Sequence, residues 1–164
     1  MAINKEKKGE ILGKLKDIVD SSKSIVFVNF HGLSVGDTTS MRRKLKEDGV
    51  GYFVSKKTLA KLALKDSKAK GDIPTLDGEF AMVYSNDDET APARGVYDFQ
   101  KKFKENLSIL GGIFDGLFKS KEEMTEIATI PSLQVLKGMF VNVINSPIQG
   151  LVVALSEVAK KKEN

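Results

Sequence analysis

Regularly spaced lysines are the side chains of this sequence most suited to chemistry, and the chemistry that they suit is polyanion binding. After Ser55, which we interpret as a helix N-cap, the chain carries Lys57, Lys61, Lys65 and Lys68. Spacings of three and four residues put all four ammonium groups on one face of a helix. Like charges at i,i+4 repel by roughly 0.2–0.5 kcal/mol per pair, and no glutamate in this segment offsets that repulsion. A bound polyanion would offset it.

The apolar residues of the same segment predict how this helix packs. Leu59, Leu62 and Ala63 share the face opposite the lysines and are expected to point into a core, whereas Leu64 falls among the lysines. A face of charged residues is more often solvated than bound to a ligand. On composition alone, a solvated lysine face is therefore the more ordinary interpretation.

The net charge of the chain is distributed unevenly. Residues 1–70 hold 16 Lys/Arg against 8 Asp/Glu, residues 71–130 hold 6 against 12, and residues 131–164 hold 4 against 2, so the segments carry +8, −6 and +2 and sum to +4. Basicity confined to the first half is typical of a polyanion-binding surface rather than of general solubility.

Composition bounds the class of protein. A chain of 164 residues is long enough for one buried core and an appendage. It contains no cysteine, which excludes disulfides and thiolate metal sites and fits a cytoplasmic protein. The charged N-terminus is not followed by the apolar stretch of a secretory signal. No apolar run is expected to reach the roughly 20 residues that span a bilayer, so no membrane partner is predicted.

Elements that would position the lysines alternate between strands and helices. Two successive strand–helix–strand units predict the α/β (α+β) class, specifically a two-layer split βαβ, ferredoxin-like domain with an antiparallel sheet, helices on one side and extra helices as decoration. Strands are predicted over 25–30, 52–54, 80–84 and 107–114, and helices from Asn4 to about 20, over 34–46, 55–68 and 89–104, and from Ser120 onward.

The sequence after Pro131 is helical only, and we predict a domain boundary there, between 1–130 and 131–164. Asn145-Ser146-Pro147 is predicted to interrupt the pattern, with Pro147 in the first turn of a new helix. Burial in the core and docking to a partner are close to even as explanations of that apolar last helix. Its apolar residues are Ile148, Leu151, Val152, Leu155 and Val158.

Several motifs in order resemble the family of large-subunit ribosomal stalk-base proteins, whose bacterial members are called L-ten and whose archaeal and eukaryotic counterpart is P-zero. The family's usual Lys-Asn-Thr-Leu appears here as Lys56-Lys57-Thr58-Leu59, and the lysine that replaces asparagine keeps the attraction to phosphate. The resemblance covers nearly the whole chain. The matching segments are 31–35 (HGLSV), 41–45 (MRRKL), 54–59 (VSKKTL), 110–112 (LGG), 127–132 (IATIPS) and 147–155.

This resemblance implies an adaptor made of two parts, located in the cytoplasm on the ribosome. Residues 1–130 would bind large-subunit ribosomal RNA beside another stalk-base ribosomal protein. Residues 131–164 would dock dimers of the acidic stalk protein, about two of them, and these dimers recruit GTP-bound translation factors. The implied docking residues are the five apolar residues of the last helix. The implied RNA contacts are Gly32, Leu33, Arg42, Arg43, Lys56, Lys57, Thr58 and Lys61.

Each type of RNA contact has a physical reason. Lysine and arginine would bind phosphates, the Thr58 hydroxyl could reach a 2′-OH, and Gly32 would let the backbone approach the RNA closely. Aromatic residues suited to stacking on bases are scarce, with Tyr52 and Phe53 on a strand. Recognition of shape and phosphates is therefore expected over reading of single-stranded bases.

Other functions find less support in the residues. A ribosome-assembly factor with the same domain is the alternative, and the apolar last helix argues against it. Catalysis would need partners for the lone His31, and none is evident nearby. No phosphate-binding loop is present, and Asp87-Asp88-Glu89 is interpreted as charge at a helix N-terminus rather than a metal site. We therefore predict no catalytic residues, no metal and no cofactor.

Overall fold

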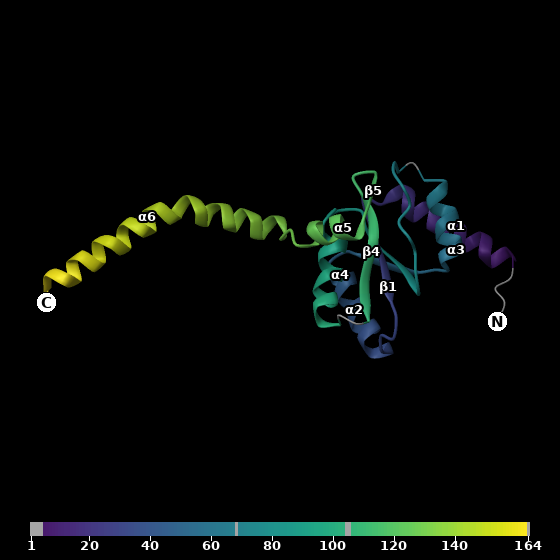
Figure 1. The fold of residues 1–164 in the computed structure, drawn as a ribbon, viewed down its shortest axis with the longest axis horizontal. Helices are drawn as coiled ribbons and strands as arrows, with labels where there is room; N and C mark the ends of the chain where they lie inside the picture. Colours follow the sequence, from purple (N-terminus) through teal and green to yellow (C-terminus); the bar gives the residue numbers. More distant parts are fainter. Residues whose placement is uncertain (1–4, 68, 104–105, 164) are drawn as a thin grey trace. The chain divides into compact units, whose positions relative to one another are not determined.

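The computed structural model describes residues 5–67, 69–103 and 106–163, so the predicted cap Asn4 and Lys68 lie outside the described residues. The chain divides into two compact units, Met1–Ile130 and Pro131–Asn164. Figure 1 draws the first as a sheet with helices around it and the second as one long helix.

A five-stranded sheet forms the centre of the first unit. Its order is β2-β3-β1-β4-β5, and all neighbouring strands are antiparallel. Helices connect β1 to β2 and β3 to β4, so the first four strands have the predicted split βαβ arrangement, and the mixed α/β class is confirmed. The strands are β1 (Ser24–Phe30), β2 (Gly51–Val54), β3 (Phe80–Ser85), β4 (Leu107–Phe114) and β5 (Leu117–Lys119).

Helices cover both faces of this sheet, which corrects the prediction of two layers with helices on one side. On β1, Val26 and Val28 point to one face and Ile25 and Phe27 to the other, and all four are buried. The extra helices α1 and α3 therefore form a third layer of their own (Figure 1). The bounds are α1 (Lys5–Ser21), α2 (Val35–Glu47), α3 (Lys57–Lys65), α4 (Ala91–Lys102) and α5 (Lys121–Ala128).

Several local signals in the sequence correctly locate the ends of elements. Ser34 is the N-cap of α2, and its hydroxyl accepts a hydrogen bond from the Asp37 N–H (3.1 Å). Ser120 and Glu123 form a capping box at the start of α5. Asp115 and Gly116 both have positive φ, 52° and 70°, and form the tight turn between β4 and β5. The pairing of β1 with β4 shifts register between Phe27 and Val28, which marks a β-bulge.

The start of α4 differs from the prediction. The helix begins at Ala91 rather than near Glu89. Asp88 accepts hydrogen bonds from the backbone N–H and the hydroxyl of Thr90, both at 2.9 Å, and from Arg94. These bonds outweigh the opposing effect of desolvation and lower the pKa of Asp88. Asp88 therefore stabilises the turn that leads into the helix.

The second unit is a single helix, α6 (Leu133–Glu163), which continues through Pro147. The predicted interruption at this proline is therefore wrong, although the helix changes direction about midway along its length (Figure 1). The expectation about membrane spans also needs correction, because α6 reaches a mean hydropathy of 1.5 and is long and apolar enough to cross a membrane. Its polar residues Asn142, Asn145 and Gln149 share one face, which indicates an amphipathic helix instead.

Candidate nucleic-acid interface and apolar helix

Helix α3 presents the lysines, and it begins one residue later than an N-cap at Ser55 predicts. Lys56 is the N-cap, with an extended backbone (φ −69°, ψ 133°), and no side chain of a described residue caps the first turn. The Ser55 hydroxyl is instead buried without a hydrogen-bond partner among the described residues. The first N–H groups of α3 thus have no side-chain acceptor.

The predicted burial of Leu62 and Leu64 in α3 is reversed in the structure. Leu64 is 1% exposed, whereas Leu62 is 48% exposed. Ala60, Ala63 and Leu64 pack inward at i, i+3 and i+4 because α3 packs against both α1 and the sheet, and these contacts determine which stripe is buried. Leu64 thus belongs to the core and does not interrupt the lysine face.

The lysine face of α3 consists of Lys57, Lys61 and Lys65, and all three are exposed. The nearest carboxylate along the chain, that of Asp66, is bound by Lys16 of α1 (Nζ–Oδ2 2.7 Å). In the described part of the chain, none of the three face lysines forms an ion pair. Their charge is therefore available to an external anion, and Lys57 lies at the partly positive N-terminal end of the helix.

An open cavity of about 560 Å³ lies at the start of α3 and brings three of the predicted contact residues together. Lys56, Lys57 and Thr58 line one side of it. The other walls come from the ends of the central strands: Phe30 closes β1 and Phe80 begins β3. The antiparallel pairing of β1 with β3 places these two ends together.

Arg42 joins this site through two aromatic rings. Its guanidinium carbon lies 4.8 Å from the centroid of the Tyr52 ring. Tyr52 packs edge-on against Phe30, with ring centroids 6.4 Å apart, and Phe30 lines the cavity. Burial raises the pKa of Tyr52, and the neighbouring positive charge of Arg42 opposes that rise. The phenol is therefore neutral at physiological pH, and no ion pair within the described residues involves Arg42.

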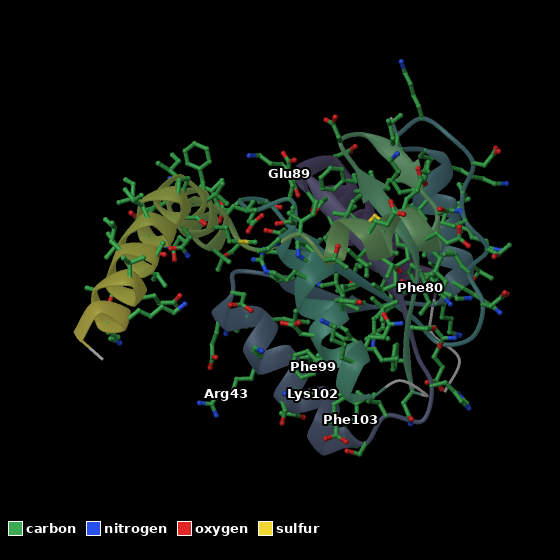
Figure 2. The ribbon with its side chains drawn as sticks, turned by 60° about the vertical axis from the view of Figure 1, so that its left-hand side comes forward. Arg43, Phe80, Glu89, Phe99, Lys102 and Phe103 are labelled. Atoms are coloured by element: carbon green, nitrogen blue, oxygen red, sulfur yellow. The ribbon has the colours of Figure 1, made fainter. Side chains whose placement is uncertain are left out.

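The remaining predicted RNA contacts are placed differently from one another. Gly32 is exposed with φ +71°, as its turn requires, and its carbonyl accepts a hydrogen bond from Asn106 Nδ2 (2.6 Å). Leu33 is half-buried against the core beneath α2 and α4. Arg43 pairs with Glu47 one turn along α2 (3.3 Å), and Figure 2 shows it projecting from the domain, apart from Phe80. Leu33 and Arg43 are thus the weakest members of the predicted set.

The apolar residues of α6 are exposed along its whole length. Described residues 133–161 include no buried side chain. The five predicted docking residues are each more than half exposed: Ile148, Leu151, Val152, Leu155 and Val158. The same stripe continues on the N-terminal side of Pro147 through Leu136, Phe140, Val143 and Ile144, which are also exposed.

Sequence reasoning missed the aromatic part of the basic site. Phe30, Phe80 and Tyr52 read as ordinary strand residues, since nothing in their local pattern differs from that of a core strand. A signal was nevertheless present, because Phe30 is the last residue of one strand and Phe80 the first of another. In a split βαβ sheet these two ends meet beside the start of the helix that follows β2.

Comparison with known proteins identifies the family. A sequence model of the family described as ribosomal protein L10 matches residues 3–101. The large ribosomal subunit protein uL10 of Dehalococcoides mccartyi (strain CBDB1) is 36% identical over 154 residues, which cover 94% of this chain and 88% of the relative. That of Bacillus cereus (strain B4264) is 34% identical over 158 residues, 96% and 95% of the two chains. The chain belongs to the ribosomal protein L10 family.

Membership in the L10 family fixes the coarse function. The chain is a protein of the large ribosomal subunit, which confirms the resemblance drawn from the motifs and agrees with a role in translation on the ribosome. The L10 family is one of structural proteins rather than enzymes. No group of three or more metal-ligating side chains occurs within the described ranges.

Proposed function

We propose that this L10-family chain is the base of the ribosomal stalk. The first unit binds large-subunit ribosomal RNA, beside a neighbouring stalk-base protein, through α3 and the residues around its N-terminus. The second unit, α6, docks dimers of the acidic stalk protein, which in turn recruit GTP-bound translation factors. Its mechanism is positioning: one unit attaches to RNA while the other displays the stalk dimers.

The observation that carries the RNA half of this proposal is the exposed lysine face of α3. Three like charges follow one another at i,i+4 on a helix whose nearest carboxylate is bound by Lys16. A solvated face would be more stable with interleaved glutamates, whereas phosphates would neutralise this one. Arg42 adds a charge on the neighbouring side of the cavity, and family membership supplies the RNA.

The apolar stripe of α6 supports the docking half. Helices with this much exposed apolar surface are covered by a partner in functional assemblies. An amphipathic helix buries its stripe in a groove of the partner, with anchors at i, i+3, i+4 and i+7. Lys160 and Lys161 at the end of the stripe favour an acidic partner through long-range attraction.

The length of the stripe supports about two dimers. Its exposed apolar residues form one set before Pro147 and one set after it. Each set spans roughly ten residues, and the proline between them marks a natural division. We therefore assign one dimer to the set around Phe140 and one to the set around Leu151.

A pull-down with the host's acidic stalk protein tests this proposal. The matched samples are the intact chain and residues 1–130, which contain all the buried core residues of the described chain. Capture by the intact chain alone, with equal RNA binding by both samples, is the expected result. Capture by neither sample would favour the second candidate, a ribosome-assembly factor that binds RNA without retaining a stalk.

A further inference from the structure

The cavity beside α3 has two chemically distinct sides. Phe80, 3% exposed, and Phe30 give it apolar walls, while Lys56 and Lys57 carry positive charge at its opening. Its volume of about 560 Å³ falls within the range of roughly 300–1,000 Å³ that is usual for ligand sites. A ligand that fits would combine a flat apolar part with an anionic group.

Two unsatisfied polar features point to such a ligand. The Ser55 hydroxyl, in a residue of the cavity wall, is buried and has no hydrogen-bond partner within the described ranges. Burial without a partner is unfavourable, and rotation of the Ser55 side chain into the cavity, where a ligand would accept its hydrogen bond, would remove that cost. Separately, the first turn of the nine-residue helix α3 has no side-chain cap from any residue that the structure describes, so its N–H groups can bind an anion.

A carboxylate also lines the cavity and bears on the orientation of the ligand. Glu79, between Gly78 and Phe80, lines the cavity and is exposed. It would repel a phosphate, which therefore belongs on the side of Lys56 and Lys57. As an acceptor, the Glu79 carboxylate would favour a base that carries an amino group.

We propose that the cavity receives one unstacked nucleotide of the bound RNA, with its base against Phe30 and its phosphate at the N-terminus of α3. Proteins read unpaired RNA bases by stacking them on aromatic rings, and Phe30 offers such a ring at the cavity, supported by its edge-on contact with Tyr52. This inference rests on the proposed function, because the RNA supplies the nucleotide. It adds base recognition to a surface otherwise expected to recognise phosphates and shape.

Filling the cavity tests the inference without altering any charge. Val54 ends β2 at the cavity wall and is 42% exposed, so Val54→Trp adds bulk there with little disturbance of the core. Leu117→Trp is the matched control, because Leu117 is 44% exposed on β5, at the opposite edge of the sheet. The ligand is the smallest large-subunit rRNA fragment that the intact chain protects from nuclease.

We expect Val54→Trp to weaken RNA binding by about 5- to 150-fold, the range for loss of one stacked base. The slope of log K against log salt should not change, since no phosphate contact is lost, and Leu117→Trp should bind as the parent does. Phe30→Leu is a second variant that keeps an apolar side chain and loses the stacking surface, and it should also weaken binding. Cooperative thermal unfolding of each variant confirms its fold.

Other outcomes separate this inference from the proposed function. Equal RNA affinity for Val54→Trp, Leu117→Trp and the parent would overturn the nucleotide site, and the RNA-binding proposal would survive if Lys57→Glu still lowered the salt slope. An unchanged affinity and slope for Lys57→Glu as well would remove both proposals. Binding of GMP to the intact chain, blocked by Val54→Trp while RNA affinity stays the same, would assign the cavity to a free nucleotide instead.

Discussion

The two units of this chain differ in the surface that they expose and in the structure beneath that surface. In residues 1–130, charged side chains lie over a sheet whose central strand is buried on both faces. In α6, apolar side chains are exposed on a helix that has no core of its own among its described residues. The first surface is held in place by a folded core, whereas the second, on the proposed function, would be buried only when a partner covers it.

This difference predicts two kinds of binding. A preformed basic site should bind through counterion release, so its affinity should fall steeply with salt. An apolar helix that is covered on binding should depend on buried area and should respond weakly to salt. Variants that separate these two behaviours would test the comparison.

The largest effect is expected from charge placed on the stripe of α6. Leu151→Asp with Leu155→Asp should weaken capture of the stalk protein by more than about 100-fold, because each carboxylate would have to be buried in an apolar groove. Val153→Asp is the matched control, since Val153 is similarly exposed (57%) on the other side of the helix. Binding measured by calorimetry should fall only for the double variant, and an equal loss for Val153→Asp would show that the stripe does not form the interface.

The next effect concerns the core packing that holds α3 in place. Leu64→Ala should lower the free energy of unfolding by about 2–5 kcal/mol, because it removes a buried side chain between α1 and the sheet. Leu62→Ala, two residues away and half exposed, should change it by less than about 0.5 kcal/mol. Denaturant titration of both variants measures this contrast. Equal destabilisation would mean that α3 packs on a different face.

A smaller and more specific effect is expected from the lysines themselves. Lys57→Glu with Lys61→Glu should weaken RNA binding and flatten the salt slope by roughly 1.4–1.8, at about 0.7–0.9 for each lost phosphate contact. Lys121→Glu, an exposed lysine on α5, should leave the slope unchanged. Filter binding at several salt concentrations gives the slopes. A double variant with the parental slope would show that the lysine face is only solvated.

The smallest effect is expected from Asp88, away from both surfaces. Its pKa is lowered in the folded state, so its stabilising contribution is complete above the ordinary value of 3.8 and is lost as the pH falls through the lower folded pKa. Asp88→Asn should therefore cost at most about 1 kcal/mol at neutral pH, as for a partly exposed ion pair. The difference in melting temperature between the parent chain and Asp88→Asn should become smaller below pH 3.8. A difference that does not depend on pH would exclude this ionic contribution.

Local signals predicted most of the fold, and long-range contacts explain what they missed. Ser34 and Ser120 each carry their capping partner three residues ahead, so the sequence alone locates the starts of α2 and α5. Leu62 and Leu64 could not be assigned in this way, because the buried stripe of a nine-residue helix depends on the position of α1. The continuity of α6 through Pro147 was missed because a proline inside a helix and one in its first turn look alike in sequence.

The candidate site was likewise predicted only in part from the sequence. Lys56, Lys57 and Thr58 are consecutive and were recognised together, and the structure places them on one wall of the cavity. The aromatic residues Phe30 and Phe80 come from two separate strands, and only the topology of the sheet brings them to the cavity, with Tyr52 of a third strand packed against Phe30. Pattern reasoning therefore found the charges and missed the stacking surface.

The most direct test of the two-unit account is a salt titration of both interactions with the intact chain. The affinities for the rRNA fragment and for the acidic stalk protein would be measured between 50 and 500 mM KCl. We predict a steep fall of RNA affinity with salt, a nearly flat stalk-protein affinity, and unchanged RNA binding when stalk protein saturates α6. Parallel salt dependences, or competition between the two ligands for the chain, would contradict the assignment of one function to each unit.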